Sequence, residues 1–106
     1  MRLVLSVLLS LLISLSAHAA ELSQESLQGS WLSLTINGQA DEDNYMWEFE
    51  GNKFYQNLGG RRMRPDNFTV AGNEIDLGYS KIKVKKFDKD SMTAEWAGFT
   101  YTFKKK

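Results

Sequence analysis

From Trp31 onwards, apolar and polar residues alternate in short runs, and Gly-containing turns interrupt these runs about every ten residues. Alternation with a period of two predicts β-strands that bury one face. Three of the turns are two-residue steps that tolerate positive φ and are typical of tight hairpins: Gly51-Asn52, Gly59-Gly60 and Gly72-Asn73. We therefore predict an all-β fold, an antiparallel up-and-down meander of about seven or eight short strands that closes into a small barrel.

The two-residue turns also set the register of their hairpins. At residues 51–52, the register places Phe49 opposite Phe54 on one face and Glu50 opposite Lys53, as an ion pair, on the other. The turns at residues 72–73 and 97–98 likewise place apolar residues opposite apolar residues. This agreement between neighbouring strands supports the predicted registers, because a slip by one residue would mix the two faces.

Two segments depart from simple alternation. Between Trp31 and Ile36, the residues Leu32, Leu34 and Ile36 share one parity, so we expect them to face the core and Trp31 to pack out of phase at the base. Pro65 separates two segments of opposite parity, which predicts a β-bulge close to it.

The first 19 residues have the features of a signal peptide. Arg2 precedes an apolar run from Leu3 to Leu15, and Ala17-His18-Ala19 is a small-x-small cleavage site. The run is short for a transmembrane helix, and no second long apolar segment follows it. We therefore expect a signal peptide over residues 1–19, cleaved after Ala19, and one domain over residues 20–106 that has no membrane span and is periplasmic or secreted.

The composition restricts the chemistry of this domain. The chain has no Cys, and its single His, His18, falls in the predicted signal peptide. This excludes Ser-His-Asp and Cys-His catalysis, thiol redox chemistry and disulfides, as well as zinc or copper sites that need imidazole or thiolate. The formal net charge of +0 gives no surplus of basic residues for nucleic acid. We predict a protein that is not an enzyme, uses no cofactor or metal, and does not bind nucleic acid.

A short helical turn with Ser23 as N-cap is predicted directly before the first strand. Together with Gly29-Ser30-Trp31 and the meander that follows, it resembles the lipocalin-like (calycin-type) small β-barrels of exported bacterial proteins. Three later runs add to the resemblance, at residues 70–77, 92–94 and 101–104. The resemblance implies that Trp31 packs at a closed base, where Lys104 takes the place of the family's basic residue over this tryptophan.

The alternation of the loops predicts where a binding site lies. The turns at 51–52 and 72–73 share one end with the helical turn, whereas the long 37–44 loop and the turns at 59–60, 78–80 and 97–98 share the opposite, open end. Gln56 faces inward there and needs a partner, which is Arg61, a buried water or a ligand. We predict binding at this mouth by the following residues: Tyr45, Trp47, Gln56, Leu58, Arg61, Met63, Tyr79 and Phe99.

Three charged segments have alternative interpretations. Residues 61–64 carry three arginines that could attract an anionic partner, but pairing with the acids of residues 41–50 is favoured. Residues 41–44 offer oxygen ligands for calcium, but Tyr45 and Met46 break the calcium-loop pattern, so a solvated loop is favoured. Glu48 and Glu50 are spaced as a glycosidase pair could be, but they lie on a convex face without a cleft.

These observations favour a binding protein over an enzyme. The first hypothesis is that the mouth binds a small apolar or amphipathic molecule. The alternative is a filled barrel that binds another envelope protein, as an inhibitor, an immunity protein or an accessory factor.

Overall fold

The computed structural model describes residues 21–106, so the predicted signal peptide of residues 1–19 lies outside the described residues. One short helix, α2 (Gln24–Leu27), precedes eleven strands that belong to a single antiparallel sheet. The strands are β1 (Gly29–Ile36), β2 (Gln39–Ala40), β3 (Tyr45–Glu50), β4 (Lys53–Leu58), β5 (Arg61–Arg62), β6 (Asp66–Asn67), β7 (Thr69–Ala71), β8 (Glu74–Asp76), β9 (Lys81–Phe87), β10 (Ser91–Trp96) and β11 (Phe99–Lys105).

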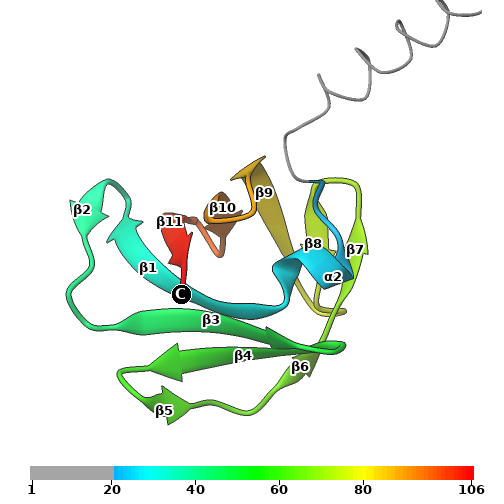
Figure 1. Cartoon of the computed structure of the whole chain (residues 1–106), viewed down its shortest axis with the longest axis horizontal. Helices are drawn as coiled ribbons and strands as arrows, with labels where there is room; N and C mark the ends of the chain where they lie inside the picture. The colour runs from blue at the N-terminus through cyan, green and yellow to red at the C-terminus, as the bar shows by residue number, and fades with distance from the viewer. Residues whose placement is uncertain (1–20) are drawn as a thin grey trace, which may run out of the picture.

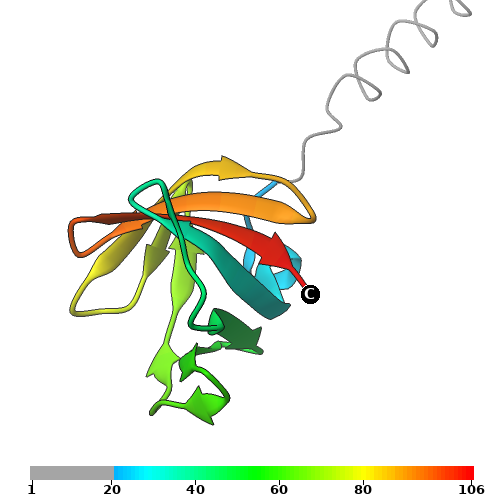
Figure 2. The ribbon, with the colours of Figure 1, turned by 90° about the vertical axis from the view of Figure 1, so that its left-hand side faces the viewer.

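The sheet has the order β5-β4-β3-β1-β11-β10-β9-β8-β7, with β2 beside β1 and β6 beside β4. It curls into a half-barrel, in which β9 to β11 form one wall and β3 to β5 form the other (Figure 2). β2 and β5 lie at one end of the molecule, and α2 lies at the opposite end (Figure 1). The predicted all-β, antiparallel fold is thus confirmed in the form of a curled sheet. The sheet has more strands than the predicted seven or eight, because it includes β2, β5 and β6, which have only two residues each and are too short to give an alternating pattern.

The predicted hairpin registers are confirmed. β3 and β4 pair Phe49 with Phe54 and Glu50 with Lys53 across the turn at residues 51–52. The pairs across residues 72–73 and 97–98 also match, with Val70 opposite Ile75 in the former hairpin. A two-residue turn leaves little freedom in register, so these contacts follow from short segments of sequence alone.

The predicted ion pair between Glu50 and Lys53 is wrong. Glu50 Oε2 lies 2.6 Å from Nη2 of Arg62, and Lys53 Nζ donates a hydrogen bond of 2.5 Å to Oδ1 of Asn67. The reason is that β5 and β6 both pair with β4, on the side away from β3, and bring Arg62 and Asn67 over the same outer face. Arg62 also contacts Glu48 at 2.9 Å, so its predicted pairing with the acids of residues 41–50 is confirmed.

The predicted orientation of the first strand is wrong. Trp31 and Ser33 face the core, at 0% and 2% exposure, whereas Leu34 is 43% exposed. A bulge at Leu34 lets odd-numbered residues face the core before it and an even-numbered residue face the core after it, because the register with β11 shifts between Ser33 and Thr35. After the bulge, Ile36 packs against the core as predicted.

The bulge predicted near Pro65 is confirmed. Arg62 pairs with Asn57 and Asp66 pairs with Phe54, so four steps on one strand match three on the other. The extra residue changes the parity of the chain before β6. One residue, Phe68, then separates β6 from β7, so a single extended segment pairs with β4 and, further on, with β8.

The base of the sheet lies beside α2, whose predicted N-cap Ser23 accepts the Ser26 amide. Trp31 Nε1 donates a hydrogen bond of 2.8 Å to the Leu27 carbonyl, and Lys105 Nζ lies 5.1 Å from the centre of the Trp31 ring. The expectation that Lys104 covers Trp31 is therefore wrong by one residue. Lys105 is the ladder partner of Trp31 and shares its face, whereas Lys104 is opposite Leu32 on the other face.

Aromatic rings fill the interior of the curled sheet. The Trp47 ring has four ring neighbours at 4.3 to 5.8 Å, namely Phe54, Trp96, Tyr101 and Phe103. Such contacts add to the hydrophobic stabilisation that a small domain without disulfides requires. Across residues 21–106, no helix has the length and apolar character to cross a lipid bilayer.

Candidate binding pocket at the open end of the sheet

A pocket of about 250 Å³ opens at the end of the molecule away from α2. Three of its lining residues are among those predicted from the sequence, Tyr45, Gln56 and Leu58. The remaining walls come from Ile36 at the end of β1 and from Asp41 and Asp43 before β3. These six residues define the mouth pocket.

The segment that carries the two aspartates is shaped by a turn that the sequence analysis missed. Asn37 and Gly38 have φ angles of 52° and 82° and fold β2 back onto the end of β1. The Asp41 amide then donates a hydrogen bond of 2.9 Å to the Leu34 carbonyl, which fixes the start of the following loop. Asn-Gly is a strong signal for a tight hairpin, so this turn could have been found within the predicted 37–44 loop.

The loops at this end are tied together. The Asn37 amide donates to the Thr100 carbonyl at 2.7 Å, and the Thr100 amide donates to Asn37 Oδ1 at 2.8 Å. A Cβ placed on Gly59 would lie 3.5 Å from the Asp43 carbonyl oxygen. The 37–44 segment therefore lies against both the 59–60 and the 97–98 turns, as the alternation of loops predicts.

A chain of hydrogen bonds runs from the core to the wall of the mouth pocket. Trp47 Nε1 donates to the Tyr45 hydroxyl at 2.8 Å, and this hydroxyl donates to Gln56 Oε1 at 2.6 Å. The partner of Gln56 is thus Tyr45, which is not one of the three expected partners. Burial raises the pKa of Tyr45 to about 12, although the Trp47 hydrogen bond opposes the rise. Tyr45 consequently remains a neutral hydrogen-bond donor at ordinary pH.

The two aspartates of the mouth pocket form no ion pair within residues 21–106. Asp41 Oδ1 accepts a hydrogen bond of 3.0 Å from the Asp43 amide. Asp41 Oδ2 is buried, and no donor among residues 21–106 reaches it. The ion pairs in this part of the chain involve Glu48, Glu50 and Glu95 instead. Within the same described range, no three acidic side chains come close enough to hold a metal ion.

The structure places the other predicted site residues around the mouth pocket or away from it. Trp47 is fully buried beneath Tyr45. Phe99 is half-exposed, and the centre of its ring lies 6.3 Å from that of Tyr101. The centre of the Tyr101 ring lies in turn 6.0 Å from that of Tyr45. Phe99 therefore extends the aromatic wall without lining the pocket itself.

Arg61, Met63 and Tyr79 do not line the mouth pocket. Arg61 is exposed and opposite Leu58 in the ladder, at the rim. The Met63 amide donates to the Gln56 carbonyl at 2.7 Å, and its side chain is exposed. The Tyr79 hydroxyl donates to Asp66 at 3.1 Å. Tyr79 lies beside Asp66 because β7 follows β6 directly and pairs with β8, which keeps the β8–β9 connection close to β6.

A polar cluster on the outer face of β3 and β4 uses the remaining carboxylates. Burial raises the pKa of Glu48, but hydrogen bonds from Arg62, Asn57 and Ser30 outweigh this effect and leave the pKa below its usual value. The Arg62 guanidinium also lies 3.9 Å from the centre of the Tyr55 ring. Because its members are paired with one another, this cluster holds the strands together and presents no free acid or base.

Larger hollows lie elsewhere on the surface. One of about 660 Å³ lies beside α2, and another of about 400 Å³ lies near the 97–98 turn. The mouth pocket is the stronger candidate because inner-face side chains line it and because a hydrogen-bonded chain fixes its wall. Comparisons of the sequence and the structure with protein families, curated proteins and solved structures give no match.

Proposed function

We propose that this chain is an exported, non-enzymatic binding protein that holds a small amphipathic molecule in the mouth pocket. The observation that carries the proposal is the composition of this pocket. Ile36 and Leu58 supply apolar surface, while Gln56 and the two aspartates supply polar groups around the same cavity. Ligand sites combine apolar walls with a few convergent polar groups in this way.

The size of the pocket and the packing behind it support a small ligand. The volume of about 250 Å³ is below the roughly 300–1,000 Å³ that is typical of sites for drug-sized molecules. Behind the pocket, the Trp47 ring contacts the Phe103 ring at 4.3 Å and the Tyr101 ring at 5.2 Å. A ligand therefore rests at the mouth, against the half-exposed Leu58 side chain, and does not enter the interior.

The proposal includes a lipocalin-like barrel. Gly29, Trp31 and Lys105 meet at the base, and the first long strand pairs with the last. The segment of β6 and β7 pairs with strands from both ends of the sheet. We propose that this segment closes the half-barrel into a small barrel, and that the predicted signal peptide directs it to the periplasm or the medium.

A nuclear magnetic resonance titration tests the proposal. Isotope-labelled protein is titrated with hexanol, a neutral amphipathic probe, and with its cationic and anionic analogues. The Trp47 indole N–H should shift with at least one probe, because its acceptor Tyr45 lines the pocket. The Trp31 indole bonds to Leu27 at the base and serves as an internal control. Absence of any shift at Trp47, Ile36 and Leu58 with all three probes would contradict the proposed function.

A protein partner is the second candidate. Leu58, Met63 and Phe99 each expose more than two fifths of their surface. All three belong to the strands or loops of the open end, and such side chains are frequent in protein interfaces. If a partner co-purifies with the exported protein, replacement of Leu58 and Phe99 by serine should release it, whereas replacement of the distant Leu22 should not.

A further inference from the structure

We infer that the polar head of the ligand is a cation, namely an organic ammonium group on a short alkyl chain. This inference rests on the proposed function and concerns the same mouth pocket. It follows from the charges, the rings and the apolar groups of the pocket, each of which favours one part of such a ligand.

The charges come first. Asp41 and Asp43 both line the pocket, and the ion pairs among residues 21–106 leave both carboxylates without a basic partner. Asp41 Oδ2 is buried and receives no hydrogen bond from this part of the chain. Asp41 as a whole is half-buried. A carboxylate with one oxygen withdrawn from solvent and without a basic partner is unfavourable, and a cation bound beside it would offset part of that cost. An anionic head would meet like charge at the same position.

The aromatic wall favours the same charge. Tyr45 lines the pocket, and the centre of the Tyr101 ring lies 6.0 Å from the centre of the Tyr45 ring. Cations are attracted to the faces of such rings, and aromatic side chains recognise ammonium ligands by this interaction. Burial raises the pKa of Tyr101, and the negative charge of Asp41 adds to this rise, which indicates that the carboxylate acts on the aromatic wall.

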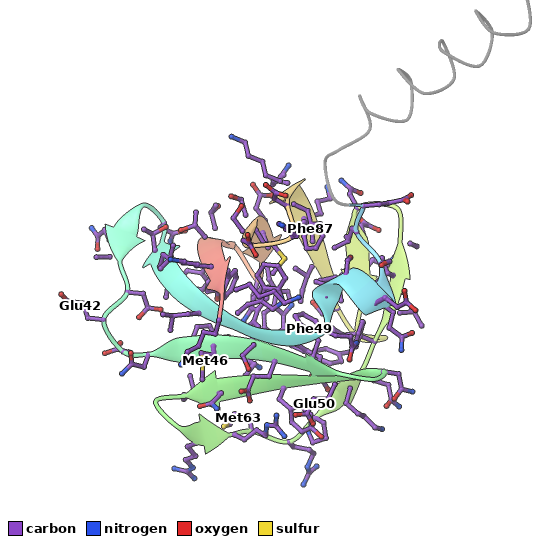
Figure 3. The ribbon with its side chains drawn as sticks, in the orientation of Figure 1. Glu42, Met46, Phe49, Glu50, Met63 and Phe87 are labelled. Carbon is purple, nitrogen blue, oxygen red and sulfur yellow. The ribbon has the colours of Figure 1, made fainter. Side chains whose placement is uncertain are left out.

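The remaining walls determine the rest of the ligand. Ile36 and Leu58 offer aliphatic surface to an alkyl chain, and the volume of about 250 Å³ restricts its length. Two further charged side chains lie near the rim. Arg61 is exposed and forms no ion pair with the described acids, so it opposes the binding of a cation. Glu42 is exposed and points away from the body of the molecule (Figure 3).

The test compares three probes that share a six-carbon chain: hexylammonium, hexanol and hexanoate. Dissociation constants are measured at the Ile36 and Leu58 amides. Hexylammonium should bind up to about fivefold more tightly than hexanol, since one charge pair near the surface changes affinity by about this factor. Hexanoate should bind most weakly. The double variant Asp41→Asn, Asp43→Asn should lose the preference for hexylammonium and keep its affinity for hexanol.

Two further variants sharpen the test. Glu42→Gln removes the same charge outside the pocket and should leave the preference for hexylammonium within about twofold of that of the original protein. Arg61→Gln should tighten hexylammonium binding, because it removes the opposing charge from the rim. Weaker hexylammonium binding in Arg61→Gln would mean that the guanidinium contacts the ligand, and would contradict the inference.

The outcomes separate the inference from the proposed function. If hexanol or hexanoate binds the pocket as tightly as hexylammonium does, the ligand class is wrong and the proposed function stands. If no probe shifts the pocket residues, both are wrong. Amide dispersion and the urea midpoint of each variant show whether the fold is kept, and Asp→Asn changes preserve the size of the side chain. Should the double variant unfold, the two single variants carry the same comparison.

Discussion

Replacement of Tyr45 by Phe tests the hydrogen-bonded wall of the mouth pocket most sharply. The change keeps the ring but removes the hydroxyl that accepts from Trp47 Nε1 at 2.8 Å and donates to Gln56 at 2.6 Å. Trp47 is 0% exposed, so water does not replace the lost acceptor. A buried donor left without a partner costs about 1–3 kcal/mol. Gln56 is half-buried and can bond to water instead, so the loss of its hydrogen bond from Tyr45 adds less than about 1 kcal/mol.

We therefore expect Tyr45→Phe to lower the free energy of unfolding by about 1–4 kcal/mol, and the melting temperature by on the order of 10 °C. Urea unfolding followed by far-ultraviolet circular dichroism measures the change without depending on tryptophan emission. Tyr101→Phe is the matched control. Tyr101 is also buried beside Trp47, but its hydroxyl makes no hydrogen bond within the described part of the chain. The control should cost less than about 0.5 kcal/mol. Equal losses in the two variants would refute the role assigned to the Tyr45 hydroxyl.

Three other predictions concern pH and charge. The pKa of Tyr45 is about 12 in the folded protein and 10.0 in the unfolded chain. The contribution of this group to stability should therefore be fully present below pH 10 and be lost between about pH 10 and 12. Unfolding at graded pH should show this loss in the original protein and a smaller one in Tyr45→Phe. Lys105→Ala should cost about 1 kcal/mol through the lost contact with the base tryptophan, whereas Lys104→Ala should change stability by less than about 0.5 kcal/mol in the same urea assay. Arg62→Gln should raise the pKa of Glu48, as measured by side-chain carboxyl chemical shifts, and an unchanged pKa would show that the ion pair is not formed in solution.

The hairpins could be predicted because their registers depend on a few adjacent residues. The Gly51-Asn52 turn is enough to place Phe49 opposite Phe54. The ion pair between Glu50 and Lys53 was predicted wrongly for the opposite reason, although the two residues are ladder partners. A residue on an outer face has neighbours on two strands, and the choice of Arg62 as partner depends on how β5 returns along β4.

The first strand shows where local patterns stop being sufficient. The sequence favours an inward Leu34, but the bulge at this residue exists only through pairing with β11, which lies far along the chain. The same long-range register decides that Lys105, and not Lys104, covers Trp31.

The candidate site was predicted in part, for related reasons. Parity along β3 and β4 brings Tyr45, Gln56 and Leu58 to one pocket. Tyr79 is on a connection whose direction depends on the course of β6 and β7, so alternation of loops alone did not place it. Asp41 reaches the pocket wall through the tight turn at Asn37-Gly38, a dipeptide that favours two-residue hairpins.

Intermolecular nuclear Overhauser effects between hexylammonium and the protein test the assignment of the mouth pocket most directly. The alkyl chain should give contacts to the methyl groups of Ile36 and Leu58, which line the pocket. The methyl groups of Leu27, buried at the base beside Trp31, should give none. Contacts to Leu27, or to residues beside α2 in place of the pocket methyls, would contradict a binding site at the open end of the sheet.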